Sequence, residues 1–118
     1  MNDSEAGVEG FLTGLRQCGI DPDVRQGVVV FPIDAVDGAY AGRLVETGVS
    51  TDELGAWPAI PPHWVHLPAE VQFARSNTQA SDISGWTKHS RGMTGWGDAE
   101  NPSQAYLAHV RGIVGEAA

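Results

Sequence analysis

The stretch WPAIPPHWVHLP, residues 57–68, holds four prolines and two tryptophans in twelve residues. Each proline fixes its own φ angle and removes a backbone donor, so the proline-rich half cannot lie inside a helix or in a central strand. The β-branched and aromatic residues after the paired prolines favour extended structure. The stretch therefore predicts a stiff crossing that leads into a strand over residues 61–67.

Before this stretch, the sequence predicts one helix and a pair of strands. A helix over residues 4–18 is indicated by apolar residues at the spacing i, i+3, i+4 and i+7, namely Val8, Phe11, Leu12 and Leu15. The run GVVVFPI, residues 27–33, is β-branched and predicts a strand. An Asp-Gly pair in VDGA, residues 36–39, is typical of a tight hairpin turn, with a return strand over residues 40–49.

After the stretch, residues 77–101 show no periodicity and are rich in glycine and polar side chains. Two tryptophans within them favour a long ordered loop over disorder. A second helix is predicted from about 102 to 116, because Asn101 suits the N-cap, Pro102 suits the first helical position and Gln104 completes a capping box.

These elements together predict a single α+β domain over residues 1–118. It has an N-terminal helix, an antiparallel meander of three to four strands, a long ordered loop and a C-terminal helix. A chain of 118 residues is long enough for one modest core and too short for two domains.

The amino-acid composition limits the classes of partner that the protein is expected to bind. The formal net charge is −8 with only seven Lys and Arg, which argues against a nucleic-acid partner and favours a neutral or basic protein surface. Apolar runs are far shorter than the roughly 20 residues that cross a bilayer, so no membrane span is expected. The acidic start of the chain is unlike a signal peptide, which predicts a cytoplasmic protein.

Trp57, Pro58, Pro61 and Pro62 resemble the aromatic-Pro-x-x-Pro-Pro segment of the ubiquitin-conjugating-enzyme superfamily, and the predicted order of elements resembles its fold. The run WTKHSR, residues 86–91, followed by Trp96, looks most like the bacterial group called prokaryotic family E. This resemblance implies a UBC-like fold in which those four residues are structural. It also implies that the partners are a ubiquitin-like protein and the enzyme that activates this modifier.

The sequence departs from that family at its reactive residue. The standard family carries a cysteine about eight residues after a His-Pro-Asn motif, whereas the only cysteine here, Cys18, ends the first predicted helix and is expected to be a small packing residue. Aligning Asn77 with the family's asparagine puts Gly85 at the cysteine position. Aligning Phe73 with the preceding strand puts His89 there instead.

Non-cysteine candidates for catalysis are His89, Ser84, Ser90 and Ser81, with His89 as the base for a serine hydroxyl or as the reacting residue. Trp86, Arg91 and Trp96 are candidates for partner binding. Two mechanisms stay open: transfer of the modifier through one of these residues, or a non-catalytic scaffold that binds the modifier or its activating enzyme. A third interpretation is an unrelated small α+β domain with a site around its histidines.

No cofactor and no metal are expected. His63 and His66 lie three apart on a predicted strand, so their side chains point to opposite faces and cannot chelate one ion together.

Overall fold

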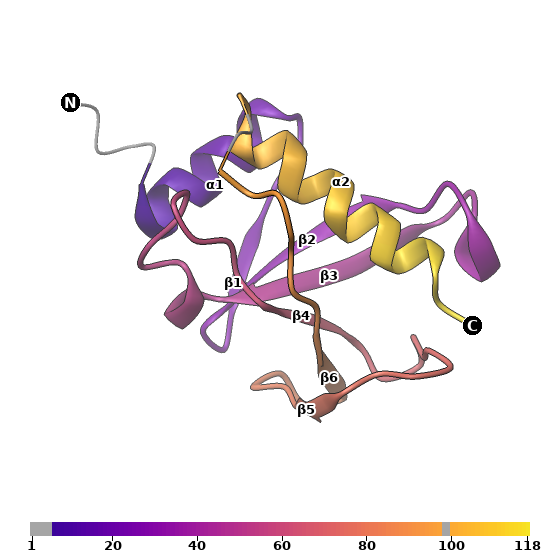
Figure 1. Ribbon diagram of the computed structural model, residues 1–118. Helices are drawn as coiled ribbons and strands as arrows, with labels where there is room; N and C mark the ends of the chain where they lie inside the picture. The colour runs from indigo at the N-terminus through magenta and orange to yellow at the C-terminus, as the bar shows by residue number, and fades with distance from the viewer. Residues whose placement is uncertain (1–5, 98–99) are drawn as a thin grey trace.

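The computed structural model describes residues 6–97 and 100–118, so the first two residues of the predicted helix 4–18 lie outside the described part. The fold is α+β, with helix α1 (Gly7–Gln17), helix α2 (Pro102–Gly115) and one six-stranded antiparallel sheet (Figure 1). The strands follow the order β1-β2-β3-β4-β6-β5 across the sheet. Their bounds are β1 (Asp23–Arg25), β2 (Val28–Asp34), β3 (Leu44–Ser50), β4 (Trp64–Pro68), β5 (Thr78–Ala80) and β6 (Trp86–Ser90).

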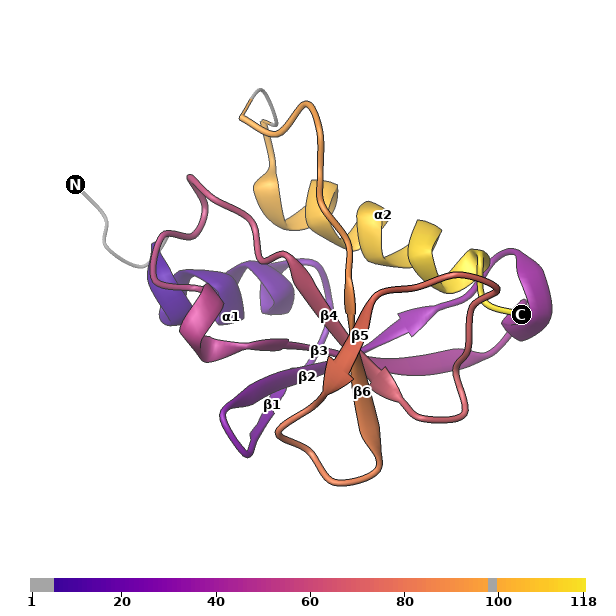
Figure 2. The ribbon, with the colours of Figure 1, turned by 60° about the horizontal axis from the view of Figure 1, so that its bottom comes forward.

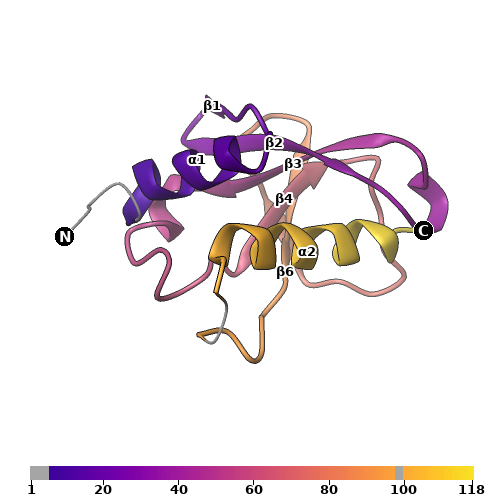
Figure 3. The same cartoon turned by 90° about the horizontal axis from the view of Figure 1, so that it is seen from above.

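Both helices cover the same face of the sheet, as the view from above shows (Figure 3). The main core lies between these two layers and includes Phe11 and Leu15 of α1, Phe31 of β2, and Val65 and Leu67 of β4. Alternation along β4 therefore turns Trp64 and His66 to the opposite face, which no helix covers. None of the described helices is long and apolar enough to cross a membrane.

The C-terminal helix begins as the sequence predicts. The side chain of Asn101 caps it by accepting a hydrogen bond from the backbone N–H of Gln104 at 3.1 Å, and Pro102 occupies the first turn. Its predicted apolar stripe is buried against the sheet and α1, namely Tyr106, Leu107, Val110, Ile113 and Val114.

The proline stretch packs against both helices through Trp57. Trp57 is only 2% exposed, and its ring lies 4.9 Å from that of Phe11 and 5.8 Å from that of Tyr106, measured between centroids. The Trp96 indole N–H donates to the carbonyl oxygen of Pro58 at 2.8 Å, and its ring packs on Trp57. The peptide bond between Trp57 and Pro58 is cis. Trp57 is therefore buried, with its ring against α1, α2 and the loop that holds Trp96.

Three sequence-based expectations need correction. Residues 35–43, which include a short 3-10 helix over Gly38–Tyr40, connect β2 to β3, so the predicted tight Asp-Gly turn over residues 36–39 is wrong. The return strand begins at Leu44 and not at residue 40. The segment 77–101 is not one long loop, because it contains β5 and β6, which pair with each other and extend the sheet beyond β4 (Figure 2).

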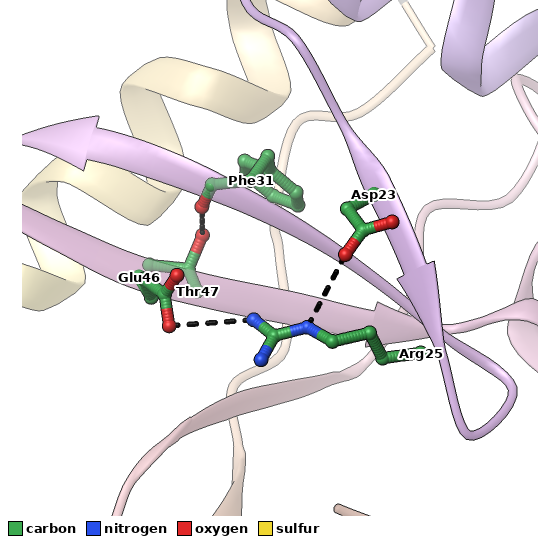
Figure 4. A network of polar contacts seen from close by, with 5 residues as sticks. All are labelled: Asp23, Arg25, Phe31, Glu46 and Thr47. Atoms are coloured by element: carbon green, nitrogen blue, oxygen red, sulfur yellow. Dashed lines mark hydrogen bonds and ion pairs between the residues drawn. The ribbon is translucent and has the colours of Figure 1, made fainter.

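The uncovered face of the sheet carries charged side chains toward its β1 edge. Arg25 contacts Asp23 at 3.5 Å and Glu46 at 3.3 Å, across three neighbouring strands (Figure 4). On the helix-covered side of the same strands, the buried hydroxyl of Thr47 donates to the carbonyl oxygen of Phe31 at 2.8 Å. This edge of the uncovered face therefore carries ion pairs, while the buried hydroxyl on the covered face is satisfied by the backbone.

Candidate functional site

Three histidines of the sheet region each form a hydrogen bond with a serine that is distant in sequence. The pairs are His63 with Ser90, His66 with Ser81, and His89 with Ser76. Register explains the arrangement, because β4 pairs with β6 so that Trp64 faces Ser90, and β5 pairs with β6 so that Thr78 faces His89. The three imidazoles differ in their exposure to solvent.

The pair of His63 and Ser90 is the accessible one. The Nε2 atom of His63 lies in a short contact with Ser90 Oγ. His63 is exposed and Ser90 is half-buried, so a partner can reach the hydroxyl from solvent. A serine hydroxyl hydrogen-bonded to an imidazole nitrogen is the arrangement that allows the imidazole to accept its proton during attack on a carbonyl.

The backbone of His63 is held from both sides. The Glu53 carboxylate accepts hydrogen bonds from the backbone N–H of His63 at 3.0 Å and from that of Trp64 at 3.2 Å. The backbone N–H of Arg91 donates to the carbonyl oxygen of His63 at 2.9 Å. Gly92 lies close to the imidazole, since a Cβ added there would come within 3.7 Å of the ring. The hydrogen bonds fix the backbone that carries the His63 ring beside Ser90.

The pair of His66 and Ser81 is buried on the uncovered face of the sheet. The distance between His66 Nδ1 and Ser81 Oγ is 2.7 Å, and His66 is 1% exposed. Burial, followed by repulsion from the Lys88 ammonium, lowers the pKa of His66 to about 4, so the ring is neutral at physiological pH. Ile83, in the turn after Ser81, packs with Val28, and its backbone N–H donates to Ser81 Oγ at 3.1 Å. The arrangement is structural.

The pair of His89 and Ser76 lies on the other face. His89 Nδ1 is 2.7 Å from Ser76 Oγ, which also accepts a hydrogen bond from the Arg91 guanidinium at 2.9 Å. The His89 ring is 4% exposed and packs against Phe73. Burial, and to a smaller degree the Arg91 charge, lower the pKa of His89. The buried Nε2 atom of His89 has no hydrogen-bond partner among the described residues.

The structure separates the catalytic candidates. His89 and Ser90 are consecutive on β6, so their side chains point to opposite faces, and the imidazole in contact with Ser90 is that of His63. Ser84 is exposed in the turn before β6, away from any imidazole contact among the described residues. Of the four candidates, only Ser90 is itself partly exposed and also hydrogen-bonded to a histidine that is exposed.

The predicted partner-binding residues are largely engaged within the chain. Trp86 packs with Ile83 and lies under the Arg25 guanidinium. Arg91 turns inward to Ser76 and stacks over Phe73. Trp96 anchors the loop to the proline stretch. Each of these side chains therefore has an internal contact that accounts for its place in the sequence.

Sequence reasoning missed Glu53, Ser76 and the role of His63. Glu53 lies in a 3-10 turn after β3. No sequence motif marks a carboxylate that holds the start of a strand, so the contact of Glu53 with the start of β4 could not be predicted. The described residues contain no cluster of three or more His, Cys, Asp or Glu side chains that could hold a metal ion.

No family model, no curated protein and no solved structure matches this chain.

Proposed function

We propose that the chain is a divergent ubiquitin-conjugating-like protein of bacterial type, which accepts the C-terminal acyl group of a ubiquitin-like modifier on Ser90. The pair of Ser90 and His63 carries this proposal, because it is the pair whose imidazole is exposed. Support comes also from the order of helix, meander and closing helix, and from Trp57 packed beneath the loop that holds Trp96. We place the reaction in the cytoplasm, where an activating enzyme would deliver the modifier.

The proposed step is an acyl transfer. His63 Nε2 accepts the proton of Ser90 as Oγ attacks the carbonyl carbon of a thioester that joins the modifier to its activating enzyme. The new bond is an ester to Ser90 Oγ, the bond that breaks is carbon to sulfur, and His63 returns the proton to the leaving thiolate. Glu53 acts as a positioning residue, since its carboxylate holds the backbone that carries the imidazole.

The test uses a peptide with a C-terminal thioester as the acyl donor. We expect intact-mass spectrometry to show one peptide acyl group added to the protein and fragment spectra to place it on Ser90. Hydroxylamine should remove the group, because it cleaves oxygen esters. Ser90→Ala should abolish the adduct, and His63→Gln should slow its formation by about 100-fold, the lower end of the range for a general base.

Two matched serines serve as controls. Ser81→Ala removes the hydroxyl paired with a buried histidine, and Ser84→Ala removes an exposed hydroxyl without a histidine partner; both should leave the rate within about twofold. An adduct that persists in a folded Ser90→Ala variant, or that maps to another side chain, would refute the assignment of Ser90.

A further inference from the structure

Lys88 is the only lysine in the chain, and it lies beside the proposed reactive serine. It precedes Ser90 by two residues on β6, so both side chains point to the uncovered face of the sheet, with their Cα atoms about 6.6 Å apart. Its ammonium sits 5.1 Å from the centroid of the Trp64 ring, and Trp64 is directly opposite Ser90 across the ladder. Serine, tryptophan and lysine therefore form one continuous patch.

The Lys88 charge has no acidic partner within the described residues, whose ion pairs all involve arginine. The neighbouring carboxylate, Glu53, is occupied by the two backbone N–H groups of His63 and Trp64. In a protein of net charge −8, an ammonium held over an aromatic ring and left without a carboxylate is a ready binding point for an anionic group.

The direction in which a substrate segment lies along β6 depends on which end of the site is blocked. Beyond Ser90, the chain passes beside the His63 ring, where a Cβ added at Gly92 would lie 3.7 Å from it, so the ring and this segment occupy the space past the end of β6. An extended segment whose last carbonyl lies at Ser90 Oγ must therefore run back along β6, over Lys88. Extended chain rises about 3.3 Å per residue, so the residue two positions before the acylating one would lie above the ammonium.

We infer that Trp64 and Lys88 recognise a substrate whose extended C-terminal segment carries a carboxylate side chain two residues before its last residue. This inference rests on the proposed function, because it assigns the substrate class of the same site. The carboxylate pairs with the Lys88 ammonium, and the intervening residue lies against the Trp64 ring.

Binding can be measured apart from chemistry in the Ser90→Ala variant. Reductive methylation with ¹³C-formaldehyde labels Lys88 and the chain's amino terminus alone, and it keeps the positive charge. The probes are acetylated, C-terminally amidated pentapeptides with Glu, Gln or Lys third from the C-terminus. We expect the Glu peptide to shift the Lys88 methyl signal and to bind about two- to fivefold more tightly than the Gln peptide, the range for a partly exposed ion pair. This preference should vanish near 0.5 M salt.

Substitutions at Lys88 and at Trp64 test the contributions of the ammonium and of the aromatic ring to binding separately. Lys88→Gln should remove the preference for Glu, Lys88→Arg should retain it, and Trp64→Ala should weaken all three peptides alike. Equal affinities for the Glu, Gln and Lys peptides would overturn the inference. A preference for Glu without any Ser90 ester in the unmodified protein would leave the recognition intact and refute only the proposed function. An ester that forms equally fast from Glu and Lys thioester peptides would refute only the recognition.

Discussion

His66 illustrates how a single buried imidazole ties stability to pH. It is 1% exposed, with Ser81 as its hydrogen-bond partner. Its pKa, about 4 in the folded chain, lies below the ordinary value of 6.5 mainly because burial penalises the charged ring. The unfolded chain therefore binds a proton on this residue at a higher pH than the folded chain does. His89 and His109 are shifted in the same direction.

We expect the free energy of unfolding to fall as pH drops from about 6.5 to 4, and this contribution to be constant above that window. One histidine contributes at most about 1.4 kcal/mol per pH unit within it. Urea unfolding across this pH range checks the slope. His66→Gln, which cannot titrate, should make it shallower. The same slope in the variant and the unmodified protein would show that His66 does not carry this linkage.

Among elements, the contact between the two helices depends on a glycine. A Cβ added at Gly14 of α1 would lie 1.9 Å from Ser103 Oγ and 3.0 Å from Ser103 Cβ, at the start of α2. Gly112 also lies within a helix, but a Cβ added there meets nothing within 4 Å. Close packing of the two helices therefore requires a glycine at position 14, whereas nothing packed around Gly112 requires one.

Gly14→Ala and Gly112→Ala should change stability in opposite directions. We expect Gly14→Ala to lower the free energy of unfolding by about 1–3 kcal/mol through overpacking. Gly112→Ala should raise it by about 0.5–1 kcal/mol through helix propensity. Adding Ser103→Gly to Gly14→Ala should recover part of the loss, measured by urea unfolding. Equal effects at the two glycines would contradict the close approach of α1 and α2.

The helices and the proline stretch could be predicted from sequence because their signals are local. The cap at Asn101 and the apolar stripe after it lie within one continuous segment, and Trp57 is fixed by the prolines beside it. Strands β5 and β6 were missed because β5 is wholly exposed and β6 lacks the alternation of a half-buried strand. Their pairing comes from tertiary contact with β4.

The candidate site was harder to predict from the sequence, because it too depends on tertiary contact between strands. His63 and Ser90 are 27 residues apart, and only the register of β4 against β6 brings them together. Sequence proximity instead suggested His89 as the base for Ser90. Adjacent residues of a strand point to opposite faces, so that choice depended on recognising β6, which the polar composition of residues 77–101 concealed.

At the scale of the whole molecule, the two faces of the sheet are covered differently. The helices and the main core cover the first face (Figure 1). On the second, Ile83 packs with Val28, whereas Ser90, Trp64 and Lys88 are each half-buried. The proposed pair of His63 and Ser90 lies where the proline stretch enters β4, and the prolines before His63 stiffen the backbone that leads to it.

The central claim is that a serine replaces the missing thiol, and Cys18 offers a control. Cys18 ends α1 and is half-buried beside the core, so Cys18→Ala should cost about 1 kcal/mol or less and leave a protein without any thiol.

The decisive measurement is a denaturing gel of the Cys18→Ala protein mixed with a ubiquitin-like modifier, its activating enzyme and ATP. We expect a band heavier by one modifier that survives thiol reductant, disappears with hydroxylamine and is absent in Ser90→Ala. A band that forms in the unmodified protein alone and is lost with reductant would restore a cysteine mechanism and contradict the account. No band, with the modifier or its activating enzyme still bound noncovalently, would contradict it in favour of a scaffold.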